Sequence, residues 1–371
     1  MKGKPVVDPV YMTATYKFDR SDDLIDVVQN RSGYIYSRWD NPSVAAVEAE
    51  LAQLEGYASS VGFGSGMAAI TTAIMANVKA GDRIVSTQEI YGGTYELLHD
   101  TLPAYHVDTV MVNCWDREKL FAEIDKGLTL LYLETPTNPL LRVVDIKPLA
   151  DAAHAKGAVV LLDATFASPV NQHPVDLGVD VVIHSATKYL GGHHDVTAGF
   201  VCCNEPYFQK IWSLRKVLGG IMDPMTAFMT LRGMRTLTLR IQRHNENAMQ
   251  IARFMETQDK VKCVHYPGLA SHPDHVVAKH QMSGFGGMLS FEINGDFDQT
   301  KRFMDALGII KLATSLGGVT SLANQPITNT HVALSPENRA KAGVSESLVR
   351  LSVGIENVDL LIEDLEQALE A

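Results

Sequence analysis

The sequence predicts an α/β protein in which a mostly parallel sheet forms a large domain and a smaller α+β domain follows it. Three observations lead to this prediction. Short apolar runs alternate with helical segments through most of the first 223 residues. Near Pro224 the pattern changes to one long helical segment followed by short strands and helices. The length of 371 residues also exceeds the size at which a single hydrophobic core keeps growing.

The N-terminal segment predicts an extended arm, because it has little regular periodicity and contains Pro5, Pro9 and Pro42. Such an arm needs a surface to lie on, and a neighbouring subunit is a natural candidate. From Ser43, a predicted N-cap, apolar residues recur at helical spacing until Gly56. We therefore divide the chain into an arm over 1–45, a large domain over 46–223 and a small domain over 224–371.

The alternating segments predict a sheet with helices on both faces. The six predicted strands are SSVGF, DRIVST, VDTVMVN, LTLLYLE, AVVLLDA and VDVVIHS, and helical patterns follow the first four. In the small domain, residues 223–256 predict one long helix with a kink near Gly233. The runs GMLSFEI and LVRLSVG then predict strands, and DQTKRFMDAL predicts a helix.

Composition excludes several classes of function. Apolar residues make up 46% of the chain and charged residues 20%, which is typical of a globular protein. The net charge of −11 and the absence of a basic run argue against nucleic-acid binding. The N-terminus lacks the apolar region of a secretory signal, and no apolar run approaches the roughly 20 residues that span a bilayer. The four cysteines contain no CxxC pair and predict free thiols. We expect a cytoplasmic protein with no membrane contact.

Polar residues that directly follow apolar runs identify a candidate site, because parallel strands bring their carboxyl ends to one edge of the sheet. Lys188 follows VVIHSAT; by position alone it could be a surface charge, an ion-pair partner or a nucleophilic amine. Asp163 ends the preceding run, and Gly66 in FGSGM begins a helix whose free N–H groups can bind an anion. Ser185 and Thr187 add hydroxyls. An amine, a carboxylate and a phosphate cradle together predict pyridoxal phosphate as cofactor.

Two other phosphate-binding patterns do not fit. A Walker A loop requires GxxxxGK[ST], and no such sequence precedes Lys188. The stretch GFGSG is also not GxGxxG, in which each glycine has a separate role.

Nine motifs in order make the sequence similar to the Cys/Met-metabolism family of pyridoxal-phosphate enzymes. They are YSRWDNPS, GSGMAAI, YGGTYELL, ETPTNPLLRVVDI, DATFASP, HSATKYLGGHHDV, YPGLASHP, SLGG and VRLSVGIEN. The resemblance spans nearly the whole chain. It implies the fold type I of PLP-dependent transferases, as in aspartate aminotransferase. It also implies an amino acid as substrate.

The resemblance assigns roles around the cofactor. Lys188 resembles the Schiff-base lysine and proton carrier, and Asp163 resembles the partner of the pyridine nitrogen. Four positions match phosphate contacts in the family: Gly66, Met67, Ser185 and Thr187.

Further roles concern the ring and the substrate. Tyr91 resembles the tyrosine stacked on the cofactor ring, which can also act as an acid or a base. Asn138 matches a residue near the phenolic oxygen of the ring. Arg350 is similar to the arginine that binds the substrate carboxylate, a bidentate task suited to guanidinium. Ser315 matches a neighbour of that arginine and of the lysine.

Tyr36 and Arg38 resemble the pair that reaches the phosphate of the adjacent subunit. The resemblance therefore implies a homo-oligomer, a dimer with shared sites and commonly a tetramer. We predict no metal site: His193 and His194 have no third ligand at suitable spacing.

Three positions depart from family members. Gly93 stands where methionine γ-lyases have a cysteine, and Thr320 stands where cystathionine enzymes often have a glutamate. Ala164 replaces an asparagine beside Asp163. We therefore expect γ-elimination from a C4-substituted amino acid of homocysteine or homoserine type. Methionine, homocysteine, cystathionine and an O-linked analogue such as canavanine are the candidates, with 2-oxobutanoate or a related product.

Other activities stay open. The main alternative is a γ-replacement synthase, such as cystathionine γ-synthase or an O-acylhomoserine sulfhydrylase. A cofactor-binding protein without turnover and an aminotransferase are further hypotheses.

Overall fold

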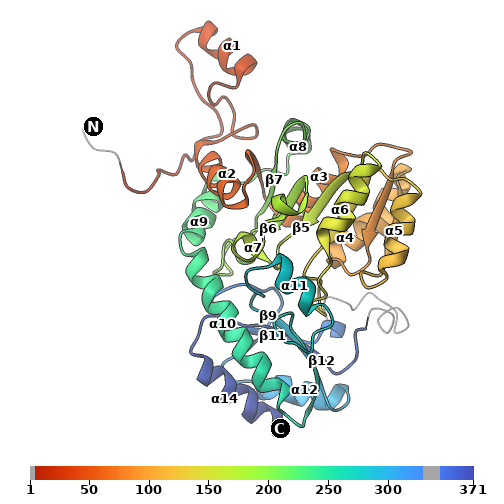
Figure 1. The fold of residues 1–371 in the computed structure, drawn as a ribbon. Helices are drawn as coiled ribbons and strands as arrows, with labels where there is room; N and C mark the ends of the chain where they lie inside the picture. Colours follow the sequence, from red (N-terminus) through yellow and green to blue (C-terminus); the bar gives the residue numbers. More distant parts are fainter. Residues whose placement is uncertain (1–4, 329–342) are drawn as a thin grey trace.

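A seven-stranded sheet forms the centre of the larger part of the molecule (Figure 1). The computed structural model describes residues 5–328 and 343–371. The strand order is β1-β7-β6-β5-β4-β2-β3. The neighbouring strands β6, β5, β4, β2 and β3 all pair in parallel. The strands are β1 (Ser59–Phe63), β2 (Arg83–Thr87), β3 (Asp108–Val112), β4 (Leu130–Glu134), β5 (Val159–Asp163), β6 (Val181–Ser185) and β7 (Gly199–Cys203).

The sequence predicts all of these strands except β7. This strand pairs antiparallel to both β6 and β1. It escaped prediction because no helix separates it from β6; the loop over 186–198 returns the chain directly. The sheet is therefore mostly parallel, as expected, with one antiparallel strand inside it.

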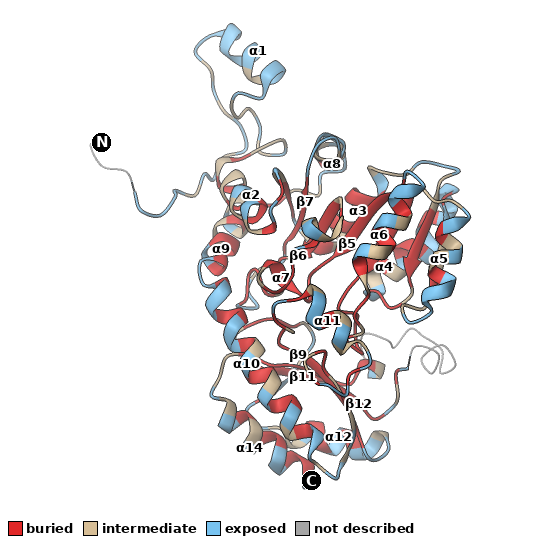
Figure 2. Ribbon diagram, in the orientation of Figure 1, coloured by how far each residue is buried: buried red, intermediate tan, exposed pale blue. Residues whose placement is uncertain are grey.

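Helices cover both faces of the large sheet, so its strands are buried on either side (Figure 2). One face packs against α2 (Pro42–Glu55), α5 (Arg117–Asp125) and α6 (Ile146–Ala155). The other face packs against α3 (Gly66–Met75) and α8 (Tyr207–Leu218). Short elements complete this part: α4 (Gly92–Glu96), η1 (Leu97–Thr101), η2 (Leu102–Tyr105), α7 (Ser168–Asn171) and η3 (Pro174–Leu177).

Two helix boundaries differ from prediction. The predicted N-cap Ser43 is wrong: α2 begins at Pro42, and Asn41 is the cap, accepting the Ser43 N–H at 2.9 Å. Proline fits the first helical position because its missing N–H would be unpaired there. The predicted long helix is also interrupted at Arg235 and Thr236, giving α9 (Pro224–Met234) and α10 (Leu237–Glu256).

A five-stranded sheet lies below the first in Figure 1, in the order β10-β11-β12-β9-β8. Its apolar face packs against α10, α12 and α14, and its polar face includes Ser290, whose hydroxyl donates to Pro139 O at 2.7 Å. The remaining elements are β8 (Val261–His265), α11 (His275–Gln281), β9 (Met288–Ile293), α12 (Phe297–Ala306), β10 (Lys311–Leu312), β11 (Leu322–Asn324), η4 (Pro326–Thr328), β12 (Leu348–Ser352) and α14 (Val358–Leu369).

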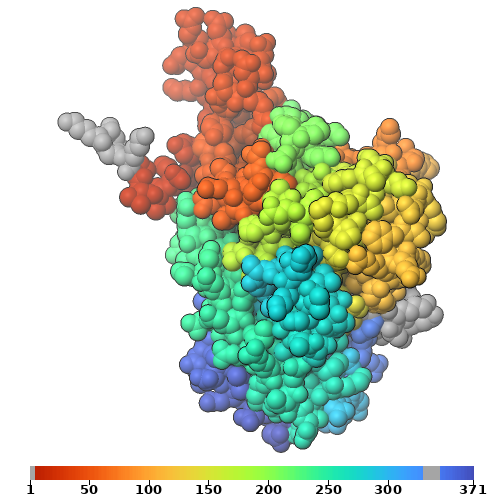
Figure 3. Space-filling view, in the orientation of Figure 1, coloured from red at the N-terminus to blue at the C-terminus, as the bar shows by residue number. Residues whose placement is uncertain are grey.

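The N-terminal arm projects from the body of the molecule (Figure 3). Its helix α1 (Ser21–Asn30) has no buried residue, and Leu24, Ile25 and Val28 are exposed. Among the described residues, no helix is long and apolar enough to cross a membrane.

Candidate functional site

Three polar side chains meet where β4, β5 and β6 end. Glu134, Asp163 and Ser185 are the last residues of these strands, and Glu134 is paired with Asp163 in the sheet register. Because side chains alternate along a strand, all three lie on the same sheet face as the apolar residues that pack against α3. The strand-end rule therefore places the predicted Asp163 and Ser185 together, on one face of the sheet.

Asp163 is a buried carboxylate, only 5% exposed, that forms no ion pair within the described residues. Its Oδ1 accepts the backbone N–H of Thr165 at 3.0 Å. Burial raises the pKa of Asp163, although this hydrogen bond and the charges of His184 and Lys188 oppose the shift. A carboxylate in this state requires a cation or a donor that the protein itself does not supply.

Glu134 is a site residue that the sequence analysis missed. Its Oε2 accepts the backbone N–H of Tyr91 at 2.7 Å, which fixes the start of α4. Burial raises the pKa of Glu134 well above its usual range, and the charge of Asp163 raises it further. The signal was available, since Glu134 ends an apolar run just as Asp163 does.

Lys188 lies three residues beyond β6 and points its amine at the small domain. Its Nζ donates to Ser315 Oγ at 2.9 Å. Burial and the nearby Arg350 charge lower the pKa of Lys188 to about 8, against the opposing effect of Asp163. A substantial fraction of the amine is therefore neutral near physiological pH, which is the form that acts as a nucleophile or base.

Ser315 connects this lysine to Arg350. The serine adopts a left-handed backbone conformation with φ of 77°, a strained state that costs about 1–3 kcal/mol outside glycine. Its carbonyl oxygen accepts Arg350 Nη2 at 3.1 Å while its hydroxyl accepts Lys188. One strained residue thus holds both cationic side chains.

Arg350 is buried on β12 and keeps a free donor. Its Nη1 donates to Asn138 Oδ1 at 3.0 Å, and its Nε has no partner among the residues that the structure describes. Burial lowers the pKa of Arg350 to about 10, so it stays charged at neutral pH. A buried guanidinium with an unpaired donor suits an incoming carboxylate.

The start of α3 forms an anion cradle. Ser65 caps the helix by accepting the Ala68 N–H at 3.1 Å, and the N–H groups of Gly66 and Met67 bind nothing within the described chain. A Cβ at Gly66 would lie 2.9 Å from Ser185 Cβ, so only glycine allows this approach. The hydroxyl of Ser185 is also without a partner in that part of the chain. These donors together suit a phosphate group.

Thr187 and Tyr91 border the cradle in different ways. Thr187 Oγ1 accepts the Ala198 N–H at 3.2 Å, which fixes the loop that carries Lys188. Tyr91 is 48% exposed. A Cβ at Gly93 would lie 2.9 Å from Tyr91 Cε1 and 3.0 Å from Met67 Sδ. Glycine at this position therefore lets the tyrosine ring and the methionine come close together.

Tyr36 and Arg38 lie apart from the other candidate residues. Arg38 donates to Lys216 O at 2.5 Å and stacks over the Tyr36 ring, and Tyr36 forms a bridge with Thr15. Within the described part of the chain, neither residue contacts the lysine, the carboxylates or the cradle. The two belong to the exposed arm.

This fold and these groups define an enzyme that uses a phosphate-bearing cofactor held by a lysine. The chain belongs to the family of Cys/Met metabolism PLP-dependent enzymes, whose family model matches residues 2–370. Pyridoxal phosphate is therefore its cofactor, and the predicted fold type is confirmed.

The relatives differ in their activities. The chain is 41% identical to "Cystathionine gamma-synthase 1, chloroplastic" of Arabidopsis thaliana over 99% of its own length, and spans 65% of that relative. It is 40% identical to "L-methionine gamma-lyase" of Pseudomonas putida over 100% of the chain and 94% of the relative. It is 42% identical to "Cystathionine beta-lyase" of Lactococcus lactis subsp. cremoris over 98% of the chain and 93% of the relative. A crystal structure of cystathionine gamma synthase from Xanthomonas oryzae pv. oryzae, 38% identical, superposes with a TM-score of 0.94 over 98% of this chain and 93% of that one.

The described residues fit this cofactor. The unpaired Asp163 would complement a protonated ring nitrogen, and Lys188 would hold the aldehyde carbon through its amine. The free donors at Gly66, Met67 and Ser185 would bind the phosphate. Each of these groups otherwise lacks a partner of the required charge within the described chain, which is what an intended ligand explains.

Proposed function

We propose that this enzyme eliminates the Cγ substituent of a C4-substituted amino acid of homocysteine or homoserine type. The observation that carries the proposal is the Ser315 bridge between Lys188 and Arg350. The arginine would bind the α-carboxylate of the substrate, and the bridge would then keep the lysine amine beside Cα.

The residues divide the chemistry as follows. The cofactor, when bound, supplies a cationic ring that withdraws electrons from the substrate. The neutral amine of Lys188 would remove the proton from Cα. After passing that proton on and becoming neutral again, the same amine would remove one from Cβ. Tyr91 would donate a proton to the leaving atom on Cγ. With one water, the substrate becomes 2-oxobutanoate, ammonia and the protonated leaving group.

Two positions narrow the substrate. Family members that act on methionine resemble one another in a cysteine at the position of Gly93, where a Cβ here would collide with Tyr91 and Met67. Thr320 offers no carboxylate to a distal amino group. The nearby Glu356 is already bound to the N–H and hydroxyl of Ser321 at 2.6 and 2.9 Å. These features favour another homocysteine-type substrate, with sulfur on Cγ, or a homoserine-type substrate, with oxygen on Cγ, over cystathionine and methionine.

The second candidate function is γ-replacement, which the identity to cystathionine γ-synthases favours. In that reaction a thiol adds at Cγ and no ammonia is released. Both functions use the same lysine, arginine and cofactor, so only products separate them.

A substrate panel tests the proposal. Purified enzyme is incubated with methionine, homocysteine, cystathionine, an O-acylhomoserine and canavanine, each with and without cysteine, and products are read by mass and ammonia release. We expect 2-oxobutanoate and ammonia without a thiol. Product formed only with cysteine would favour the synthase, and pyruvate from cystathionine would indicate β-elimination instead.

We also propose that the arm completes the site of a second subunit in a homo-oligomer. Its support is the exposed apolar surface of α1 and the lack of any contact between Arg38 and the cradle within the described residues. A mixture of Lys188→Ala and Arg38→Ala chains tests this: mixed dimers contain one site with both residues intact. Recovered activity is expected, and none would contradict a shared site. Light scattering distinguishes a dimer from a tetramer. Cytoplasmic localisation stays a prediction.

A further inference from the structure

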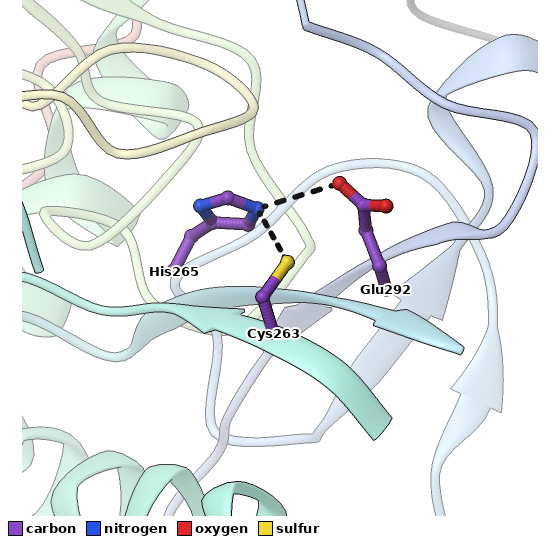
Figure 4. Close-up of side chains that lie close together, drawn as sticks. All are labelled: Cys263, His265 and Glu292. Carbon is purple, nitrogen blue, oxygen red and sulfur yellow. Dashed lines mark hydrogen bonds and ion pairs between the residues drawn. The ribbon is translucent and has the colours of Figure 1, made fainter. Parts of the chain in front are cut away.

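A second group of chemically reactive side chains lies on the small-domain sheet, outside the cofactor site. Cys263 and His265 project from β8 and Glu292 from β9, as Figure 4 shows. Cys263 is paired with Glu292 in the strand register, and His265 is two residues further along. Residues i and i+2 of a strand share a face, so all three side chains meet on one side of the sheet.

The three ligand atoms lie within 4.8 Å of one another, close to the spacing that a metal site requires. His265 Nε2 lies 3.6 Å from Cys263 Sγ and 3.9 Å from Glu292 Oε1. Tetrahedral Zn²⁺ with bonds of about 2.0–2.3 Å places its ligand atoms about 3.3–3.8 Å apart. A small inward movement of the carboxylate would therefore suffice.

The group is partly exposed, and one neighbouring cation would compete with a metal ion. His265 is 22% exposed and Glu292 11%, so solvent reaches the group. Lys262 Nζ binds the other carboxylate oxygen, Glu292 Oε2, at 2.9 Å. The oxygen that faces the histidine is thus available, while the lysine charge opposes a cation.

We propose that Cys263, His265 and Glu292 form a binding site for Zn²⁺ with a water as fourth ligand. Thiolate, imidazole and carboxylate are the ligands that this ion prefers. The sequence analysis predicts no metal site, because His193 and His194 lack a third ligand. The present group could not be found in this way, since Glu292 is remote in sequence from the other two and only strand pairing joins them. The ion would tie β8 to β9.

The site is near the cofactor site but separate from it. His265 is paired with Ser290, and Ser290 with Arg350, so the histidine is two strands from the substrate-binding arginine. That separation is about 10 Å. Variants of the three ligands should therefore keep the basal activity.

Metal binding by the untagged holoenzyme tests the site directly. We expect one Zn²⁺ per chain in equilibrium dialysis. His265→Ala and Glu292→Gln should each weaken binding by more than about tenfold, since even outer-shell partners are worth about 10–100-fold. Cys114→Ser, a cysteine outside the group, should change nothing. Equal binding by the wild type and both ligand variants, or no binding by the wild type, would overturn the proposal.

Two further variants keep the test independent of folding defects. Lys262→Met removes the competing cation and all three ligands stay, so it should tighten Zn²⁺ binding; weaker binding would contradict the site. With Co²⁺ as probe, the difference spectrum should contain a thiolate-to-metal band in the near ultraviolet that Cys263→Ser abolishes. A band that survives in this variant would place the metal elsewhere.

Discussion

At the edge of the central sheet where the parallel strands end, both faces contain buried carboxylates. On one face the carboxylate has an ion-pair partner, and on the other face it has none. His184 and Ser185 are neighbours on β6 and therefore point to opposite faces. On one face, the fully buried Glu55 of α2 is paired with His184. On the other, Asp163 and Glu134 are also buried, and neither has a cation within ion-pair distance in the described chain.

This difference indicates which carboxylates stabilise the fold and which serve the activity. A buried charge that is paired inside the protein contributes to the fold, and removing its partner exposes the cost of burial. A buried carboxylate without an opposite charge costs stability, and such groups are concentrated where proteins bind ligands or do chemistry. The paired face should therefore control stability, and the unpaired face should control activity.

The largest effect should come from Lys188→Ala. The variant removes the amine that we propose holds the cofactor and moves protons, so we expect a loss of at least about 10³-fold in kcat/KM. Folding should persist, as the lost contact is one hydrogen bond to Ser315. Steady-state kinetics and circular dichroism measure the two effects, with the exposed Lys301→Ala as control. Substantial remaining turnover would contradict the assignment of activity to the unpaired face.

On the paired face, His184→Leu should act on stability. It leaves the Glu55 carboxylate buried without a partner, which costs about 3–5 kcal/mol of unfolding free energy. The activity per folded molecule should change little. Denaturant unfolding measures the loss, and the exposed His280→Leu should stay within about 0.5 kcal/mol of wild type. A stable but inactive His184→Leu would contradict the division of roles.

On the unpaired face, Asp163→Asn should lower the activity and leave the stability unchanged. The amide oxygen still accepts the Thr165 N–H, whereas the charge that would complement the ring nitrogen is gone. We expect kcat to fall about 100-fold with no loss of unfolding free energy. Kinetics with saturating cofactor and parallel denaturant curves check both. An Asp163→Asn enzyme that is destabilised and active would reverse the assignment.

The smallest effect concerns the pH dependence of stability in the cofactor-free protein. Burial lowers the pKa of Lys188 to about 8 from its ordinary value of 10.5. Between these values the unfolded chain binds more protons than the folded one, so this lysine makes stability rise with pH from about 8 to 10.5. Lys188→Met should lack this rise. Urea unfolding of both apo-proteins across that range measures it, and identical slopes would contradict a depressed pKa.

Much of the fold and of the site was predictable because local signals carried it. The strand-end positions of Asp163 and Ser185, and the glycine at the start of α3, follow from periodicity and from helix N-terminal chemistry. Strand β7, the break between α9 and α10 and the cap of α2 were not predicted correctly. Strand β7 and the break depend on pairing and turns that the local pattern did not reveal, whereas the cap was misassigned although Asn41 followed by Pro42 is a local signal for it.

The sequence by itself determined the alternating strands and helices, the residues at the strand ends and the family. These properties come from periodicity and from motifs whose residues are close in the chain. Only the tertiary structure decided that Glu134 supports Tyr91, that Ser315 holds Lys188 and Arg350 together, and that Cys263, His265 and Glu292 share one face. The physical reason is that charge pairing and ligand spacing depend on distances in space between residues far apart in sequence, which strand register and packing set.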